Sequence, residues 1–129
     1  MTLLIISPDY ASHLYPLAAM GHVWRERGHR VVVATGQATA DIVAAFGYVY
    51  ESLQLSQGSN PGTIRAEEQP RGEDDALRGF FAATHGGMIE TLAFQARARL
   101  HDLMWEPVAT AGRVLDIIER VQPDEIIVD

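Results

Sequence analysis

Apolar runs and amphipathic stretches alternate along this chain. Residues 3–7 (LLIIS) and 30–35 (RVVVAT) are mainly apolar runs without alternation, a pattern typical of strands that are buried on both faces. Residues 48–53 form a weaker, more alternating run, and residues 125–129 (EIIVD) are a last short run with three apolar residues between two acids. We therefore predict four strands.

Between these runs, apolar residues recur at helical spacing. We predict five helices, over residues 16–27, 41–46, 76–84, 87–104 and 106–121. Pro16 suits the first turn of the first helix, and Gly28 suits its end. Gly86 and Gly87 interrupt the third and fourth helices, and one bent helix is the alternative interpretation. Residues 54–75 combine glycines, prolines and charges without a period, so we expect a long mobile loop there.

Strands and helices in alternation predict the α/β class. We expect a Rossmann-like three-layer sandwich with a parallel sheet of about four strands. In the usual order the first strand lies in the middle, the second and third lie to one side of it, and the fourth lies to the other.

Composition narrows the classes of partner. Apolar residues make up 47% of the 129 residues, enough for the core of one domain, and the net charge is −7. This charge argues against nucleic acid or an anionic membrane surface as the main partner. The chain has no cysteine, which excludes disulfides and thiolate metal sites and suits a cytoplasmic protein. No apolar stretch approaches the ~20 residues of a membrane span, and the opening residues are better read as a strand than as a signal peptide.

The first strand-to-helix turn holds the strongest chemical signal. Its sequence, SPDYASHLYP, has neither G-x-G-x-x-G nor G-K-[ST], which argues against a dinucleotide or P-loop phosphate there. It places His13 beyond the carboxyl end of a strand, where doubly wound sheets bind ligands. The positive end of a helix tends to keep an imidazole neutral and available as a base. A capping or surface histidine is the alternative interpretation.

Asp129 would lie at the carboxyl end of the last strand. If the first and last strands are neighbours, their ends are ~5 Å apart, and Asp129 can hydrogen-bond to His13. Carboxylate, imidazole and a substrate hydroxyl would form a relay like that of serine hydrolases, although G-x-S-x-G is absent. The alternative is a plain strand-end carboxylate.

The remaining candidates are weaker. Substrate contacts are expected from five residues: Tyr10, Ser12, Phe81, His85 and Met88. Most large apolar residues of the late helices should be core, but some could wall an apolar pocket. We expect His22 and His29 to be structural. We expect no metal site, because His101, Asp102 and Glu106 do not make a convincing ligand set.

At this point the residues resemble a family. SHLYPLAAMGHVWRERGHRVVVATG, residues 12–36, resembles the opening of bacterial family-1 glycosyltransferases of the GT-B fold, which attach sugars to antibiotics and other natural products. The shared pattern is a histidine, two residues, a proline, a short amphipathic helix, and RGH before an apolar strand. ADIVAAFGYVY and VQPDEIIVD are similar to later segments of the family. Many relatives have glycine where this chain has Ser12, and residues 53–104 align with nothing.

The resemblance implies a reaction. A sugar would pass, with inversion, from a UDP- or TDP-sugar to a hydroxyl of a hydrophobic natural product. His13 would be the base and Asp129 would orient it, with no metal or other cofactor. Residues 1–129 would be an incomplete N-terminal acceptor-binding domain that is inactive alone. The C-terminal nucleotide-sugar domain would be absent, and the rest of the enzyme or a second copy would be the protein partner.

Two other classes stay open. A non-catalytic Rossmann-like domain that binds a hydrophobic small molecule or a partner protein would keep the fold without needing His13. A flavodoxin-like or receiver-like domain is the third class. The lack of an acidic cluster after the first strand argues against a receiver, and the first turn does not suit a flavin phosphate.

Overall fold

The computed structural model describes residues 1–56 and 71–129, except for the side chains of residues 71–76, 99 and 101–103. The strands are β1 (Thr2–Ile6), β2 (Arg30–Thr35), β3 (Val49–Ser52) and β4 (Glu125–Val128). The helices are α1 (Ala11–Glu26), α2 (Ala40–Ala45), α3 (Arg71–Gly86), α4 (Met88–Leu103) and α5 (Pro107–Val121), with a 3-10 turn, η1, at Gln37–Thr39.

The four strands form one parallel sheet in the order β3-β2-β1-β4. Leu4 of β1 pairs with Val32 on one side and with Ile126 on the other. Parallel strands need crossover connections, and the helices between the strands provide them. The predicted α/β class, the parallel sheet and the strand order are confirmed.

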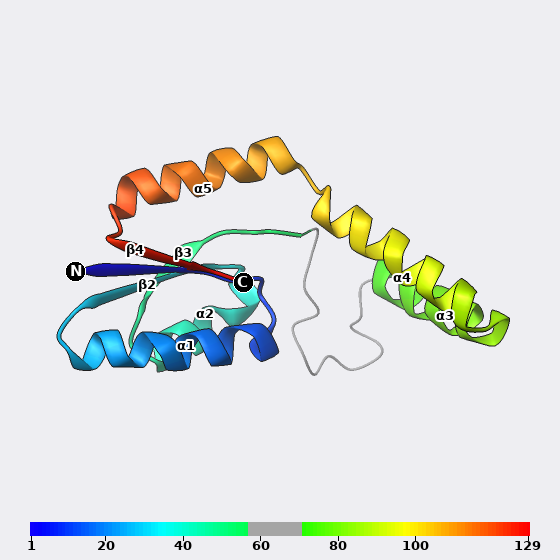
Figure 1. The fold of residues 1–129 in the computed structure, drawn as a ribbon, viewed down its shortest axis with the longest axis horizontal. Helices are drawn as coiled ribbons and strands as arrows, with labels where there is room; N and C mark the ends of the chain where they lie inside the picture. The colour runs from blue at the N-terminus through cyan, green and yellow to red at the C-terminus, as the bar shows by residue number, and fades with distance from the viewer. Residues whose placement is uncertain (57–70) are drawn as a thin grey trace.

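Helices cover both faces of the sheet. Figure 1 shows α1 and α2 on one face and α5 on the other. The core on the α1 side is made of Leu3, Ile5, Leu14, Ala18, Val31, Val33, Val43 and Tyr48. The core on the α5 side is made of Leu4, Ile6, Val32, Ala34, Leu53, Ile117 and Val121. Successive residues of β1 and β2 thus enter opposite cores, which is why these strands are apolar without alternation.

Helix α1 begins five residues earlier than predicted. Pro16 lies inside it and not in its first turn, so that prediction is wrong. The extra turn buries Leu14, which is 1% exposed, against the sheet. An interior proline removes the hydrogen bond that the carbonyl of Ser12 would otherwise accept, but the burial of Leu14 favours the helical turn before it. Gly28, with φ 79°, ends the helix as predicted.

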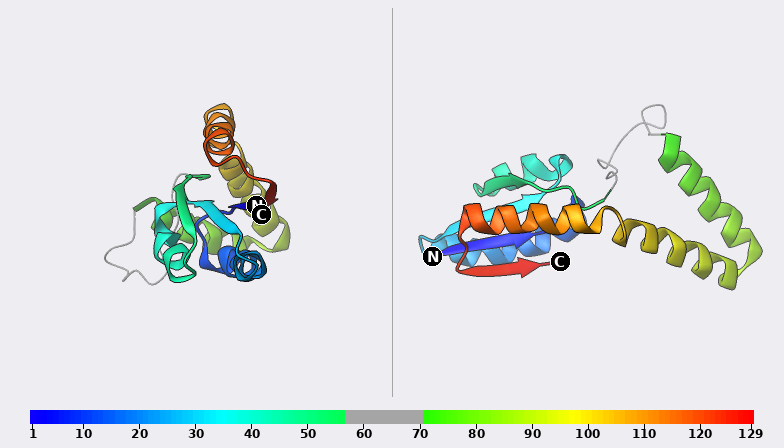
Figure 2. Two further views of the ribbon diagram at one scale, coloured as in Figure 1. Left: turned by 90° about the vertical axis from the view of Figure 1, so that its left-hand side faces the viewer. Right: turned by 90° about the horizontal axis from the view of Figure 1, so that it is seen from above.

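Helices α3 and α4 form a hairpin that extends beyond the end of the sheet in Figure 1 and in the right view of Figure 2. They are two helices and not one bent helix, because Gly87 with φ 109° turns the chain back between them. Phe80 and Phe94 pack between them, with ring centroids 6.3 Å apart.

The hairpin corrects two further predictions. The loop expected over residues 54–75 ends earlier, because α3 begins at Arg71; residues 57–70 lie outside the described residues. Phe81, Met88 and Met104 are exposed rather than core, because in the part of the chain that the structure describes α3 and α4 pack mainly on each other.

Candidate active site

The candidate site lies at the carboxyl ends of β1 and β4. The chain moves from β1 to β2 on one side and returns to β4 on the other, so the strand order reverses between β1 and β4. In doubly wound sheets, ligands bind at this switch point. The backbone N–H of Asp129 donates to the carbonyl of Ile6 at 3.1 Å, so the pairing of β4 with β1 continues as far as Asp129.

His13 and Asp129 meet at this edge. Nδ1 of His13 lies 2.5 Å from Oδ2 of Asp129, the contact that the sequence predicted. An ionised carboxylate can only accept, so Nδ1 is the donor in this bond, and in the neutral ring Nε2 then keeps a lone pair. The side chains are 48% and 35% exposed, so a substrate can reach them. The arrangement is a carboxylate-supported imidazole whose second nitrogen is able to take a proton.

Local structure holds each partner in place. The burial of Leu14 fixes the first turn of α1, and the carbonyl of Tyr10 accepts the N–H groups of His13 and Leu14, both at 3.0 Å. At the opposite end of β4, the carboxylate of Asp124 accepts the N–H of Thr2 at 2.6 Å. The N–H of Asp124 also donates to the carbonyl of Thr2 at 2.9 Å. These bonds set the register that brings the residue after β4 to His13.

Two of the predicted substrate residues lie beside this pair. Tyr10 is the N-cap of α1, and its ring centroid lies 5.9 Å from that of His13. Ser12 precedes His13 and is exposed. Both share the first turn of α1 with the imidazole, so they border the space that a substrate would occupy.

The other three predicted substrate residues lie elsewhere. Phe81 and His85 are near the end of α3, and Met88 begins α4. The turn between these helices is the part of the hairpin farthest from the sheet in Figures 1 and 2. The structure therefore separates Phe81, His85 and Met88 from His13 and Asp129.

Sequence reasoning overlooked a second acid at this edge. Asp9 follows β1 and lies against Gly36, which follows β2. A Cβ atom on Gly36 would come within 2.7 Å of the Cβ of Asp9. Asp129 directly follows β4, and Asp9 stands three residues past the end of β1, so the search for acids at strand ends could have included it.

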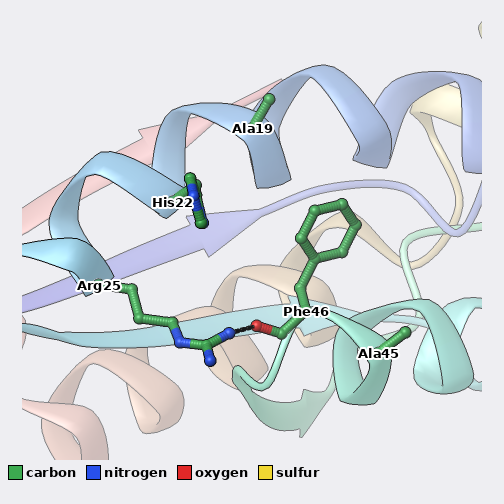
Figure 3. A pocket seen from close by; sticks show the side chains of 5 residues that line it. All are labelled: Ala19, His22, Arg25, Ala45 and Phe46. Carbon is green, nitrogen blue, oxygen red and sulfur yellow. Dashed lines mark hydrogen bonds between the residues drawn. The ribbon is translucent and has the colours of Figure 1, made fainter.

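A hollow of about 380 Å³ lies between α1 and α2, lined by Ala19, His22, Arg25, Ala45 and Phe46. Figure 3 shows Arg25 donating to the backbone carbonyl of Phe46, just past the end of α2. His22 lies 3.2 Å from the carboxylate of Glu26. Both basic groups have structural partners, in keeping with the structural role predicted for His22.

Two features are absent from the part of the chain that the structure describes. No group of three histidine, cysteine or acidic side chains among these residues could hold a metal ion. No helix among them is long and apolar enough to cross a membrane.

Known proteins resemble this chain in structure but not closely in sequence. No protein-family model matches the sequence, and no curated protein matches it. Among solved structures, the glycosyltransferase SsfS6 from Streptomyces sp. SF2575 is similar over 99% of this chain, with 22% identity and a TM-score of 0.51. The spinosyn rhamnosyltransferase SpnG, complexed with thymidine diphosphate, is similar over 100% of it, with 13% identity and a TM-score of 0.55. The calicheamicin glycosyltransferase CalG4 is similar over 99%, with 20% identity and a TM-score of 0.52.

This is the Rossmann-like fold of the GT-B glycosyltransferases. The resemblance seen in the sequence is thereby confirmed for the fold. The GT-B-like chain spans 33% of the SsfS6 structure, 29% of SpnG and 26% of CalG4. It therefore corresponds to a quarter to a third of each of these structures.

Proposed function

We propose that this chain is the acceptor side of an inverting glycosyltransferase that acts on a hydroxyl of a hydrophobic natural product. The observation that carries the proposal is the hydrogen bond between His13 and Asp129 at the switch point of a GT-B-like sheet. The names of the similar structures, among them a spinosyn rhamnosyltransferase and a calicheamicin glycosyltransferase, support an acceptor of this class.

In the proposed reaction, the free Nε2 of His13 takes the proton of the acceptor hydroxyl. The hydroxyl oxygen forms a bond to the anomeric carbon of the sugar as the bond from that carbon to the nucleotide diphosphate breaks. The diphosphate leaves with the bonding electrons, and attack from the opposite face inverts the anomeric centre. Asp129 keeps the proton of the imidazole on Nδ1 and stabilises the imidazolium as it forms.

The sugar donor needs a binding site of its own. We infer that the UDP- or TDP-sugar is bound mainly by a second domain outside these 129 residues. SpnG, of which this chain covers 29%, was solved with thymidine diphosphate bound. Ser12 borders the base and would contact the acceptor, whereas the ring of Tyr10 packs on the His13 imidazole. Phe81, His85 and Met88 would contact it only if the hairpin closes toward the sheet.

The test is a double-mutant cycle in the enzyme that includes the donor domain. His13→Ala should lower kcat by roughly 10²–10⁴-fold, the usual worth of a general base. Asp129→Asn keeps the size of the side chain but removes the charge, so it should also lower kcat strongly. The double variant should be little slower than His13→Ala, because Asp129 acts through His13.

His22→Ala is the matched control, since His22 is an exposed histidine on the same helix that pairs with Glu26. It should leave transfer unchanged. Fully additive losses in the cycle would refute the dyad. Retention of acceptor binding, together with no transfer by the unmodified enzyme, would favour the non-catalytic binding domain instead.

A further inference from the structure

We propose that Tyr10 is a positioning residue that holds the His13 imidazole in the orientation bonded to Asp129. This inference rests on the proposed function for its catalytic consequence. It assigns to the tyrosine ring a task other than contact with substrate.

The first observation is the ring contact itself. The ring centroids of Tyr10 and His13 lie 5.9 Å apart, with their planes at 50°. This is within the range at which aromatic rings attract each other beyond simple burial. The Tyr10 ring therefore packs against one side of the imidazole.

The second observation is that a backbone hydrogen bond holds Tyr10 next to His13. The carbonyl of Tyr10 accepts the N–H of His13 at 3.0 Å, so the two residues are joined three positions apart in the first turn. Tyr10 is the N-cap of α1 but makes no side-chain cap hydrogen bond. Removal of its ring therefore leaves the bonds that begin the helix intact.

The third observation is that the imidazole is half exposed. The His13 side chain is 48% exposed, and its partner Asp129 is 35% exposed and lies beyond the last residue of β4. A ring that is half in water and tied at one nitrogen can turn about its side-chain bonds when no neighbour blocks it. The Tyr10 ring blocks one direction of that turn, which keeps Nδ1 on Asp129 and Nε2 toward the substrate.

The first arm of the test observes His13 directly and needs no activity. The ¹⁵N shifts of Nδ1 and Nε2 report which ring nitrogen carries the proton. They are measured in mildly alkaline solution, where a free imidazole is neutral. The signals of His13 are identified among the five histidines by their loss in His13→Ala. The unmodified protein should show the Nδ1–H form. Tyr10→Ala should shift the ring toward a mixture of both forms, and Tyr10→Phe should restore the Nδ1–H form.

The second arm measures transfer by the enzyme that includes the donor domain. Tyr10→Ala should lower kcat by about tenfold to a hundredfold, the scale of a misplaced catalytic group, with little change in the KM of the acceptor. Tyr10→Phe should keep both constants. Tyr15→Ala is the matched control, because it removes an exposed ring of the same helix whose neighbour is Phe46, 6.1 Å away.

The outcomes separate the two proposals. Identical His13 signals in Tyr10→Ala and the unmodified protein would overturn the positioning role. A raised KM in Tyr10→Phe would also overturn it, because the hydroxyl would then be binding substrate. No transfer by the unmodified enzyme, with the His13 signals responding as expected, would refute the proposed function and leave the positioning of the ring established.

Discussion

Tyr48 joins two elements through a single buried hydroxyl. Its Oη donates to the backbone carbonyl of Ala18 in α1 at 2.7 Å, and the residue is 7% exposed. Burial raises the pKa of Tyr48 above its usual value, and the nearby Arg25 opposes this shift. A raised pKa in the folded state means that folding favours the protonated phenol. Its contribution is fully present below pH ~10 and is lost as the pH rises through the folded pKa.

We therefore predict that stability falls at alkaline pH and that Tyr48 accounts for part of the fall. Tyr48→Phe should cost about 1 kcal/mol at neutral pH, the net value of one hydrogen bond. It should also flatten the decline above pH ~10, because the residue no longer titrates. Urea unfolding at several pH values measures both effects. Tyr15→Phe, at an exposed tyrosine of α1, is the control and should keep the decline. An unchanged alkaline decline in Tyr48→Phe would contradict the prediction.

At this scale the sequence predicted the ionisable pair but not its ring neighbour. His13 and Asp129 each follow a buried apolar run, and parallel strands bring such positions to one edge. The contact of Tyr10 with His13 depends on α1 starting at Ala11, and the prediction of a start at Pro16 hid that contact.

Helix α1 can lie close to the sheet because Gly21 faces it. A Cβ atom at this position would lie 3.2 Å from side-chain atoms of both Ile5 and Val31, and 3.3 Å from the Tyr48 hydroxyl. Ile5 and Val31 are core residues of β1 and β2, and the Tyr48 hydroxyl already donates to the carbonyl of Ala18. The helix has no direction in which it could yield without loss of one of these contacts.

We predict that Gly21→Val destabilises the fold by about 1–3 kcal/mol, the usual cost of an overpacked core. Gly112→Val is the matched control, because Gly112 lies in α5 and a Cβ atom added there would meet nothing within 4 Å. There the change should stay within ~0.5 kcal/mol, since only helix propensity differs. Thermal unfolding of both variants gives the comparison. Equal effects at the two glycines would show that α1 does not depend on this close approach.

The element boundaries show where sequence patterns stop being informative. The strand prediction holds because β1 and β2 enter cores on both faces, so burial alone sets their composition. The predicted start of α1 was wrong because proline is common in the first turn of a helix, which pointed to Pro16. The burial of Leu14 against the assembled sheet instead favours a start at Ala11. The early start of α3 at Arg71 was missed because residues 71–75 are polar and carry no apolar period.

Taken as a whole, the molecule has an α/β body and a helical hairpin on one side of it. In Figure 2 the body carries β1 and β4, whereas the hairpin lies beyond the end of the sheet. The acceptor residues predicted from the sequence are therefore divided between the two parts. Periodicity located the helices, but it could not place them, because the position of α3 and α4 depends on contacts distant in sequence.

At this scale we predict that the isolated 129-residue chain transfers no sugar and binds nucleotide sugars negligibly. The proposed donor site lies in a second domain, and the first turn of this chain has no glycine-rich phosphate loop. Calorimetric titration with common UDP- and TDP-sugars measures the binding. Thymidine diphosphate alone, the molecule bound in SpnG, is the reference ligand. Micromolar affinity for either would place a donor site within this chain.

The pairing of β4 with β1 has a consequence for the order of folding. The bond between Thr2 and Asp124 joins residues 122 positions apart, and that between His13 and Asp129 spans 116 positions. Contacts at such separations form late, because a long loop must close first. During synthesis β1, β2 and β3 leave the ribosome well before β4 exists, so β1 presents an unpaired strand edge meanwhile. The nascent chain is therefore most open to mispairing at the position where β4, and with it Asp129, will later dock.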